Sequence, residues 1–187
     1  MKYLTLIRHA KSNWGDLSLS DHDRPLSERG LRAAPMVGGF LADNYLGKNG
    51  TPALLPQPDH LLSSTALRAK TTAELMHPKL GLDDSFLTFD ERVYHALPKT
   101  LLQIVREQED AFKHLMLFGH NPGLSEFVDK MICRGGMEEM PTCAAALLEL
   151  PWDVWAAADW NEARLLGFVT PRMIEKRLGM NEESTYF

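Results

Sequence analysis

The sequence contains little cysteine and no long hydrophobic run. Only Cys133 and Cys143 occur among the 187 residues, and they form no CxxC pair. A chain of this length does not need disulfides, so we expect both thiols to be reduced, with a structural bridge as the alternative. No apolar stretch approaches the roughly 18 residues that cross a bilayer, and Arg8 ends the first apolar run too early for a secretory signal. These absences predict a soluble, cytoplasmic protein without a membrane partner.

An excess of positive charge is also absent. The chain has 20 Lys and Arg residues against 25 Asp and Glu residues, a formal net charge of −5. Binding to nucleic-acid backbones requires concentrated positive charge, so we do not expect a nucleic-acid partner. The sequence also lacks a GxxxxGK[ST] nucleotide loop and a GxSxG serine elbow. Any anion must therefore be held by a few local residues.

Alternating apolar and amphipathic segments are what the sequence does contain. With 44% hydrophobic and 24% charged residues, we expect one globular domain over residues 1–187. The alternation is typical of an α/β fold with a largely parallel sheet. Within the expected helix 26–46, Ser27 is a plausible N-cap and Pro35 predicts a kink or a late restart. The expected strands are 3–7, 59–64, 86–91, 114–119, 143–151 and 163–169, and the other expected helices are 65–76, 98–109 and 123–132.

Polar side chains, whose burial costs free energy, follow three of the expected strands. Arg8 and His9 end the first strand, Arg68 lies in the first turn after the second, and His120 follows "LMLFG". Ligands of open α/β sheets bind outside the carboxyl ends of the strands. We therefore expect these four side chains to converge on one pocket.

Arginines beside histidines indicate a site for a phosphate-like dianion. The planar guanidinium group can donate two parallel hydrogen bonds to two phosphate oxygens. At about 4 Å and an effective dielectric constant of about 20, the Coulomb energy of each cation–anion contact is about 4 kcal/mol before the cost of desolvation is subtracted. A single Arg or His of this kind is more often a solvated or structural group, but four at strand ends favour a site. His9 and His120 lack further ligands at suitable spacing, and arginines repel cations, so we expect no metal.

Three segments carry a resemblance to a known family. "LIRHAKS", "SSTALRAKTTAE" and "LFGHNPGLSEF" resemble the motifs of the histidine phosphatase superfamily, which has the phosphoglycerate mutase-like fold. Ala10 replaces the usual Gly of the first motif, as in the short bacterial phosphohistidine phosphatases, the SixA-like branch. "LSDHDRPLSERG" and "GFVTPRMI" also resemble that branch. The resemblance spans nearly the whole chain and implies a three-layer sandwich, with helices on both faces of a mostly parallel sheet.

The resemblance implies a role for each strand-end residue. His9 would be the nucleophile and would attack phosphorus through one neutral ring nitrogen, while a backbone carbonyl holds the other as N–H. Arg8 and Arg68 would favour the neutral form of His9 and bind the phosphoryl oxygens. His120 would donate to the same oxygens, and Asn121 would add a further donor. No cofactor is implied.

The proton donor and two neighbouring contacts are less well defined. Glu91 in "FDERVYHA" is the candidate general acid, and His95 is the residue that would occupy the Glu position of a related motif. In "SNWG", Gly15 stands where the mutases have a phosphate-contacting Asn, so Ser12 and Asn13 are offered as substitutes. The remaining histidines are expected at the surface: His22, His60, His77, His95 and His114.

These features predict a phosphatase that works through a phosphohistidine intermediate on His9. A phosphohistidine in a protein is the leading substrate, because a phosphorylated imidazole leaves more readily than an alkoxide when the acid is weak. One alternative is an esterase acting on a small phosphorylated metabolite. A phosphate-recognition module without turnover is another. Mutase activity is less favoured, because the chain has little room for a covering lid.

Overall fold

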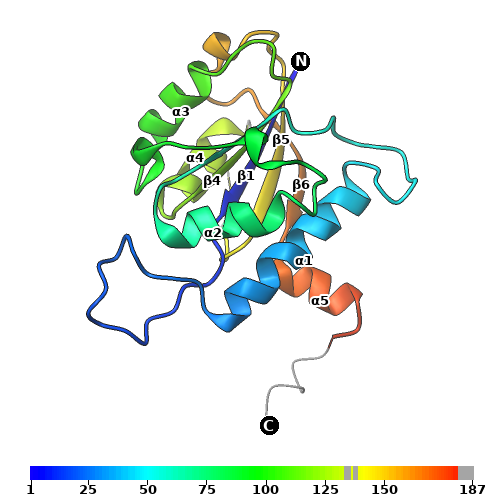
Figure 1. The fold of residues 1–187 in the computed structure, drawn as a ribbon. Coiled ribbons are helices and arrows are strands. Elements are labelled where there is room, and N and C mark those ends of the chain that lie inside the picture. Colours follow the sequence, from blue (N-terminus) through cyan, green and yellow to red (C-terminus); the bar gives the residue numbers. More distant parts are fainter. Residues whose placement is uncertain (133–135, 137–138, 181–187) are drawn as a thin grey trace.

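A six-stranded mixed sheet forms the centre of the molecule (Figure 1). The computed structural model describes residues 1–132, 136 and 139–180. The strands are β1 (Lys2–Arg8), β2 (His60–Ser63), β3 (Leu87–Phe89), β4 (His114–Gly119), β5 (Ala145–Leu150) and β6 (Arg164–Val169), in the order β3-β2-β4-β1-β5-β6. The first four strands are parallel, whereas β5 and β6 each pair antiparallel to their neighbours. The expectation of an α/β fold with a mostly parallel sheet is confirmed.

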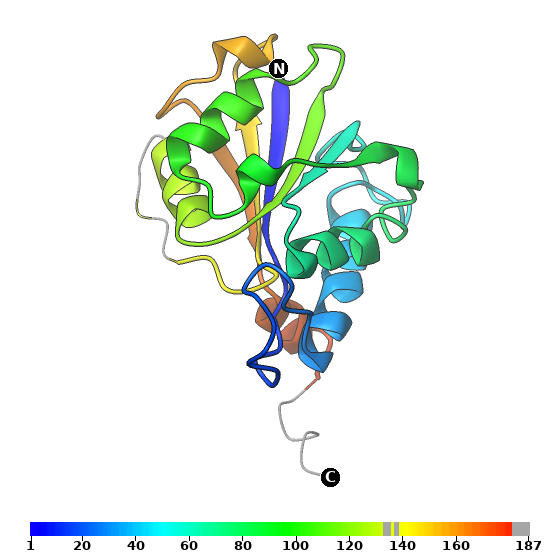
Figure 2. The same cartoon turned by 60° about the vertical axis from the view of Figure 1, so that its left-hand side comes forward.

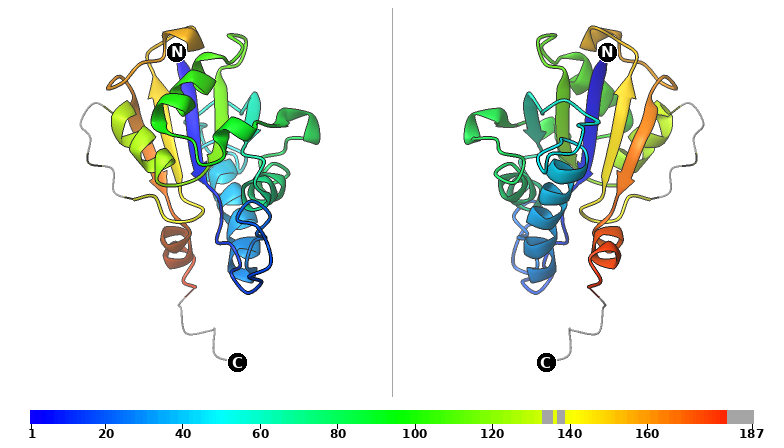
Figure 3. Two further views of the ribbon diagram at one scale, coloured as in Figure 1. Left: turned by 90° about the vertical axis from the view of Figure 1, so that its left-hand side faces the viewer. Right: turned by 90° about the vertical axis from the view of Figure 1, so that its right-hand side faces the viewer.

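Helices cover both faces of the sheet (Figures 2 and 3). They are α1 (Glu28–Asn44), α2 (Leu67–Met76), α3 (Pro98–Arg106), α4 (Gly123–Met131) and α5 (Pro171–Arg177). α1, α2 and α5 bury their apolar residues in the core on one face, and α3 and α4 do so on the other. The three-layer sandwich implied by the resemblance is therefore present. Among the helices of the described residues, none has the length and apolar character needed to span a membrane.

The central strands are apolar on both faces because each face is covered. In β1, Leu4 and Leu6 face the core beside α3 and α4, whereas Ile7 faces the core beside α1 and α2. Every residue of β4 is buried. Side chains of a strand alternate between faces, so a strand covered on both sides is continuously hydrophobic rather than alternating.

Helix α1 begins as the sequence predicts but differs at its proline. The Ser27 side chain accepts a hydrogen bond from the Gly30 amide at 3.2 Å and caps the first turn. The helix then runs through Pro35 as one element, so the predicted late restart is wrong. Proline removes one backbone hydrogen bond, and burial of neighbouring residues such as Ala34 and Val37 offsets that loss.

The strand register brings the ends of β1 and β4 together. Arg8 pairs with Gly119 in the parallel ladder, and the His9 amide donates to the Gly119 carbonyl at 3.0 Å. His9 and His120 thus leave adjacent strands at the same level. On the other side of β4, the Ser64 amide donates to Phe118 at 3.0 Å and directs the chain into α2.

Gly123, the first residue of α4, is expected to tolerate no side chain. A Cβ atom there would lie 1.9 Å from the Ala96 carbonyl oxygen, which is a severe overlap with backbone. Gly123→Ala should lower the free energy of unfolding by roughly 1–3 kcal/mol, measured by urea denaturation. Gly39→Ala is the matched control, because that Cβ would have no neighbour within 4 Å. Equal midpoints for the two variants would contradict this account.

Candidate active site

A cavity of about 650 Å³ opens at the carboxyl ends of β1, β2 and β4. It is lined by Arg8, His9, Arg68 and His120, the four residues expected to converge. They come from the end of β1, the first turn of α2 and the loop after β4. The β1–α1 loop forms part of the same end of the molecule, opposite the N-terminus (Figure 2).

Two contacts fix the proton on the His9 ring. Its Nδ1 lies 2.7 Å from the Ala10 carbonyl oxygen, which can only accept a hydrogen bond. Its Nε2 accepts from the Arg68 Nε–H at 3.3 Å. Nδ1 therefore carries the hydrogen, and Nε2 keeps a lone pair directed toward Arg68.

His9 is held in its neutral form. Burial, followed by the positive charges of Arg68 and Arg8, lowers its pKa to about 4, against the opposing effect of the Ala10 hydrogen bond. The residue is only 9% exposed. At neutral pH the ring is thus an uncharged base with an available nitrogen.

His120 lies against His9 with a free donor position. The ring centroids are 5.1 Å apart, and His120 Nε2 contacts the Ser64 hydroxyl at 2.8 Å. Nδ1 is buried and has no hydrogen-bond partner among the described residues. Burial, followed by the charges of His9 and Arg68, lowers the pKa of His120 to about 2. If Ser64 donates to Nε2, the neutral ring presents Nδ1–H to the cavity.

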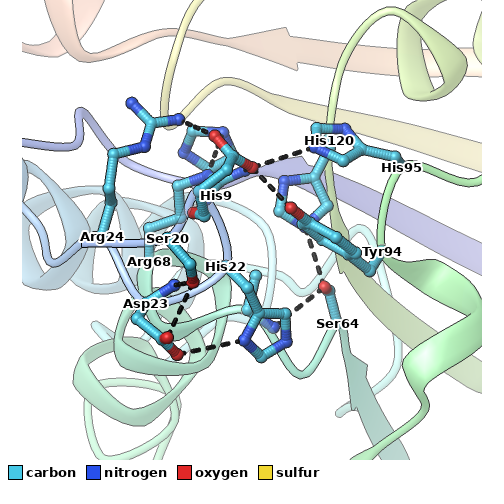
Figure 4. A network of polar contacts seen from close by, with 12 residues as sticks. His9, Ser20, His22, Asp23, Arg24, Ser64, Arg68, Tyr94, His95 and His120 are labelled. Carbon is cyan, nitrogen blue, oxygen red and sulfur yellow. Dashed lines mark hydrogen bonds and ion pairs between the residues drawn. The ribbon is translucent and has the colours of Figure 1, made fainter. Parts of the chain in front are cut away.

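The carboxylate of Asp21 binds several groups at the edge of this cluster. It pairs with Arg24 and, at 2.9 Å, with Arg68, whose Nη1 also donates to the Asp21 carbonyl. It also accepts from the Tyr94 hydroxyl at 2.6 Å and contacts His95 Nε2 at 3.0 Å. Figure 4 shows Arg24, Arg68, Tyr94 and His95 gathered beside His9 and His120. Burial alone would raise the pKa of the Asp21 carboxyl, but these hydrogen bonds hold it far below its ordinary range.

Two further arginines keep donors without partners. Arg8 donates to the Met140 carbonyl at 2.6 Å and pairs with Glu139 at 3.1 Å, while its buried Nε has no partner among the described residues. Arg24 is 8% exposed, and its Nε and Nη1 also lack partners within that part of the chain. Buried N–H groups are normally satisfied, so these donors are consistent with a site for an anion.

The residues offered as secondary contacts divide into two groups. Ser12 and Asn121 line the cavity, although the Asn121 amide already donates to Met140 and its oxygen accepts from Ser125. Asn13 is not among the lining residues, and its side chain accepts from the Gly15 amide instead.

Glu91 is exposed and is also absent from the cavity lining, which contains His95 in its place. Glu91 begins a short 3-10 helix, Glu91–Val93, and the residues that reach the cluster, Tyr94 and His95, follow that helix. The expectation that five histidines are surface residues is wrong for two of them, because His77 and His114 are buried. His95 is exposed as expected, but it also lines the cavity.

Several residues of the site were not identified from the sequence. They are Lys11, Trp14, Asp21, Arg24, Arg29, Tyr94 and Arg172. A signal existed for five of them, because they belong to segments that carry the family resemblance: Asp21, Arg24 and Arg29 to "LSDHDRPLSERG", Lys11 to "LIRHAKS" and Arg172 to "GFVTPRMI". Loop residues otherwise have no periodicity that predicts which side chains turn inward.

The cavity also contains a thiol but no metal-binding cluster. Cys143 is a free cysteine, 1% exposed, and burial raises its pKa to about 12. Cys133 lies outside the described residues. Within the described part of the chain, no group of three or more His, Cys, Asp or Glu residues is arranged to hold a metal ion.

The acidic limb of the pH–activity profile is expected at a pH well below the ordinary pKa range of histidine. Because only neutral His9 has a free Nε2 lone pair and its pKa is about 4, kcat/KM should show no loss from His9 protonation until the pH falls toward 4. Histidine 15N NMR between pH 7.5 and 4 checks the assignment directly. A His9 midpoint near 6.5 would contradict it.

The structure comparison places the chain among histidine phosphatases, and the sequence comparison finds relatives that match nearly the whole chain. No protein-family profile matches the chain. Rv1276c of Mycobacterium tuberculosis, itself uncharacterised, is 34% identical over 175 residues, which are 89% of this chain and all of that protein. The structure of SixA from Agrobacterium tumefaciens, named as a phosphohistidine phosphatase, is 27% identical with a TM-score of 0.69, covering 91% of this chain and 98% of that one. The histidine phosphatase SixA complexed with tungstate has the same fold, with 16% identity, a TM-score of 0.68 and coverage of 92% and 99%.

The chain belongs to the histidine phosphatase superfamily and is a phosphatase. Within that superfamily it is similar to the SixA-like phosphohistidine phosphatases, as the motifs "LIRHAKS" and "LFGHNPGLSEF" indicated.

Proposed function

We propose that this enzyme removes phosphoryl groups from phosphohistidine in proteins through a covalent intermediate on His9. The observation that carries the proposal is the pair of contacts on the His9 ring, Nδ1 with the Ala10 carbonyl and Nε2 with the Arg68 Nε–H. They support His9 Nε2 as the nucleophile. Arg8, Arg68 and His120 line the same cavity and would hold the phosphoryl oxygens during transfer.

The first displacement transfers the phosphoryl group to His9. Nε2 attacks phosphorus, and the bond to the substrate nitrogen breaks. Because phosphoryl transfer requires little covalent help, aligned donors are the main contribution of the protein. The Arg68 Nε–H would then donate to an oxygen of the phosphoryl group instead of to His9 Nε2.

The lack of a carboxylic acid that could protonate the leaving group, among the described lining residues, favours a phosphohistidine substrate. Among the described lining residues there is no Asp or Glu, and the nearby Asp21 carboxyl is held ionised at neutral pH. An ester oxygen leaves poorly without a proton. A phosphorylated imidazole can take a proton on its distal nitrogen near neutral pH and leave as a neutral ring.

The second displacement regenerates the enzyme. Phosphorylated His9 still carries hydrogen on Nδ1 through its bond to Ala10, so it is a cationic ring that leaves as neutral histidine. Water attacks phosphorus, the Nε2–P bond breaks with its electron pair returning to Nε2, and the product leaves as dihydrogen phosphate, which keeps both protons of the water. Neither displacement calls for a cofactor.

The test compares substrates under identical conditions. A peptide phosphorylated on its single histidine should give a higher kcat/KM than a panel of phosphate esters. Rapid quenching should trap phosphate on His9 that is labile to acid and stable to alkali. Esters turned over more efficiently than the peptide would refute the proposed substrate, and no turnover of either would indicate a binding module.

One observation favours an ester substrate as the second candidate. His95 lines the cavity and contacts the ionised Asp21, so a protonated His95 would have a counterion and could supply the proton an alkoxide needs. His95→Gln separates the two functions. It should reduce ester turnover strongly if His95 is the acid, and leave phosphohistidine turnover nearly intact.

A cytoplasmic site of action belongs to the same proposal. The buried free thiol of Cys143 supports it, because compartments with reduced thiols are where unpaired cysteines are usual.

A further inference from the structure

The cavity concentrates positive charge in a protein that is negative overall. Its described lining contains six cationic side chains and no carboxylate, although the whole chain has a net charge of −5. The six are Arg8, Lys11, Arg24, Arg29, Arg68 and Arg172. Arg8 and Arg68 belong to the reaction centre at His9, so four cations remain to be explained.

Three of those four come from separate elements, and because they are the exposed cations of the lining we call them its outer half. Lys11 lies in the β1–α1 loop, Arg29 in the first turn of α1 and Arg172 in the first turn of α5. All three are exposed, and none forms an ion pair with a described residue. Like charges brought together in a fold repel one another, so this arrangement costs stability unless an anion binds between them.

Arg24 connects the outer half to the reaction centre. It is 92% buried by residue, pairs with Asp21, and still has Nε and Nη1 without partners among the described residues. Its guanidinium lies 3.5 Å from the ring centroid of Trp14, a lining residue that is 66% exposed. A buried unsatisfied donor is costly, so its retention beside three free cations points to a ligand.

The geometry points to a second anion subsite. We propose that Lys11, Arg29 and Arg172, with Arg24 beneath them, bind acidic side chains that flank the phosphohistidine of a protein substrate. This inference rests on the proposed function. The cavity of about 650 Å³ leaves room beyond a single phosphoryl group, and the open face of Trp14 offers apolar contact to a peptide.

An acidic peptide fits this subsite better than a small molecule with two phosphates. The outer cations are exposed at the rim, where they can reach the surface of a docked protein and steer its approach. A small dianion would instead require enclosing donors to offset the loss of its hydration. The proposed subsite supplies one buried cation only, Arg24.

The experiment uses two peptides that differ only in charge. Each carries one phosphorylated histidine, flanked in one peptide by glutamates and in the other by glutamines. Exposed ion pairs contribute a factor of roughly 1.5 to 5 each, so three should give the wild-type enzyme about a tenfold lower KM for the glutamate peptide. The preference should shrink as salt is raised.

Variants assign the preference to these residues. Lys11→Gln/Arg29→Gln/Arg172→Gln should bring the glutamate-over-glutamine ratio close to one. The matched control is Lys79→Gln/Lys99→Gln/Lys113→Gln, which removes the same charge from exposed positions outside the cavity lining and should keep the wild-type ratio.

The outcomes separate this inference from the proposed function. Turnover of both peptides with equal KM would overturn the subsite and leave the proposed function intact. Turnover of neither would refute the proposed function. A ratio reduced equally by the control variant would show general charge attraction and overturn the subsite. Competition by a small bisphosphate but not by an unphosphorylated glutamate peptide would also overturn it.

Discussion

Replacing His9 by glycine should reduce turnover by roughly 10⁴-fold or more, because the Nε2 lone pair directed toward Arg68 is lost. The ring makes its contacts through Nδ1 to Ala10 and Nε2 to Arg68, so no neighbouring residue can take its place. His120 is close, but its Nε2 is engaged by Ser64. Phosphate trapped on the protein should disappear together with turnover.

Added imidazole provides a sharper test of the same variant. A diffusing imidazole can occupy the vacated space in His9→Gly, accept the phosphoryl group and restore part of the turnover. A purely structural role for His9 would not give this rescue. His60→Ala is the control, because His60 contacts Gln108 and Thr88 away from the cavity. A fully active His9→Gly enzyme would refute the covalent intermediate.

Replacing Arg68 by lysine should lower kcat/KM by roughly 10²–10³-fold, although the positive charge is kept. Arg68 is 1% exposed and uses three separate donors, one on His9 and two on Asp21. Lysine presents a single ammonium group on a flexible stem and cannot hold both partners in one plane. The loss should appear mainly in kcat, because the aligned donors matter most in the transition state.

A second variant tests whether Arg68 acts on His9 electrostatically. Arg68→Gln removes the charge that helps lower the His9 pKa, so the His9 midpoint should rise above 4 while burial keeps it below 6.5. Arg92→Gln is the matched control, since it removes the same charge from Arg92, which pairs with Asp90 and Glu107 outside the cavity. An unchanged His9 midpoint in Arg68→Gln would contradict the contact between the two side chains.

Most of the sheet could be predicted from hydrophobic patterning. The predicted strand 114–119 coincides with β4, and the predicted strand 3–7 lies within β1, because strands covered on both faces are continuous apolar runs. Strand direction was not predictable, since an apolar run is the same in either direction, and β5 runs antiparallel to both of its neighbours, β1 and β6. Helix α5 was not expected as a helix, because its seven residues are too few for helical periodicity. The expectation of one domain over residues 1–187 stays a prediction.

The candidate site was predictable where it follows strands and unpredictable where it lies on loops. Arg8, His9 and His120 stand next to apolar runs that fix their position at the sheet edge. Arg24 lies in an irregular loop, and only the folded path of that loop turns its side chain inward. The position of Glu91 outside the cavity lining likewise depends on the short 3-10 helix after β3, which no spacing rule predicts.

β1 and β4 lie in the interior of the sheet, and this position should keep the geometry of the site constant. Each is hydrogen-bonded on both sides, whereas β3 and β6 form the outer edges. Local opening of a fold starts where backbone bonds are fewest, so fraying begins at those edges. His9 and His120 follow these interior strands, whose amides should exchange more slowly than those of the edges, so the proposed nucleophilic nitrogen should keep its alignment when an edge strand opens locally.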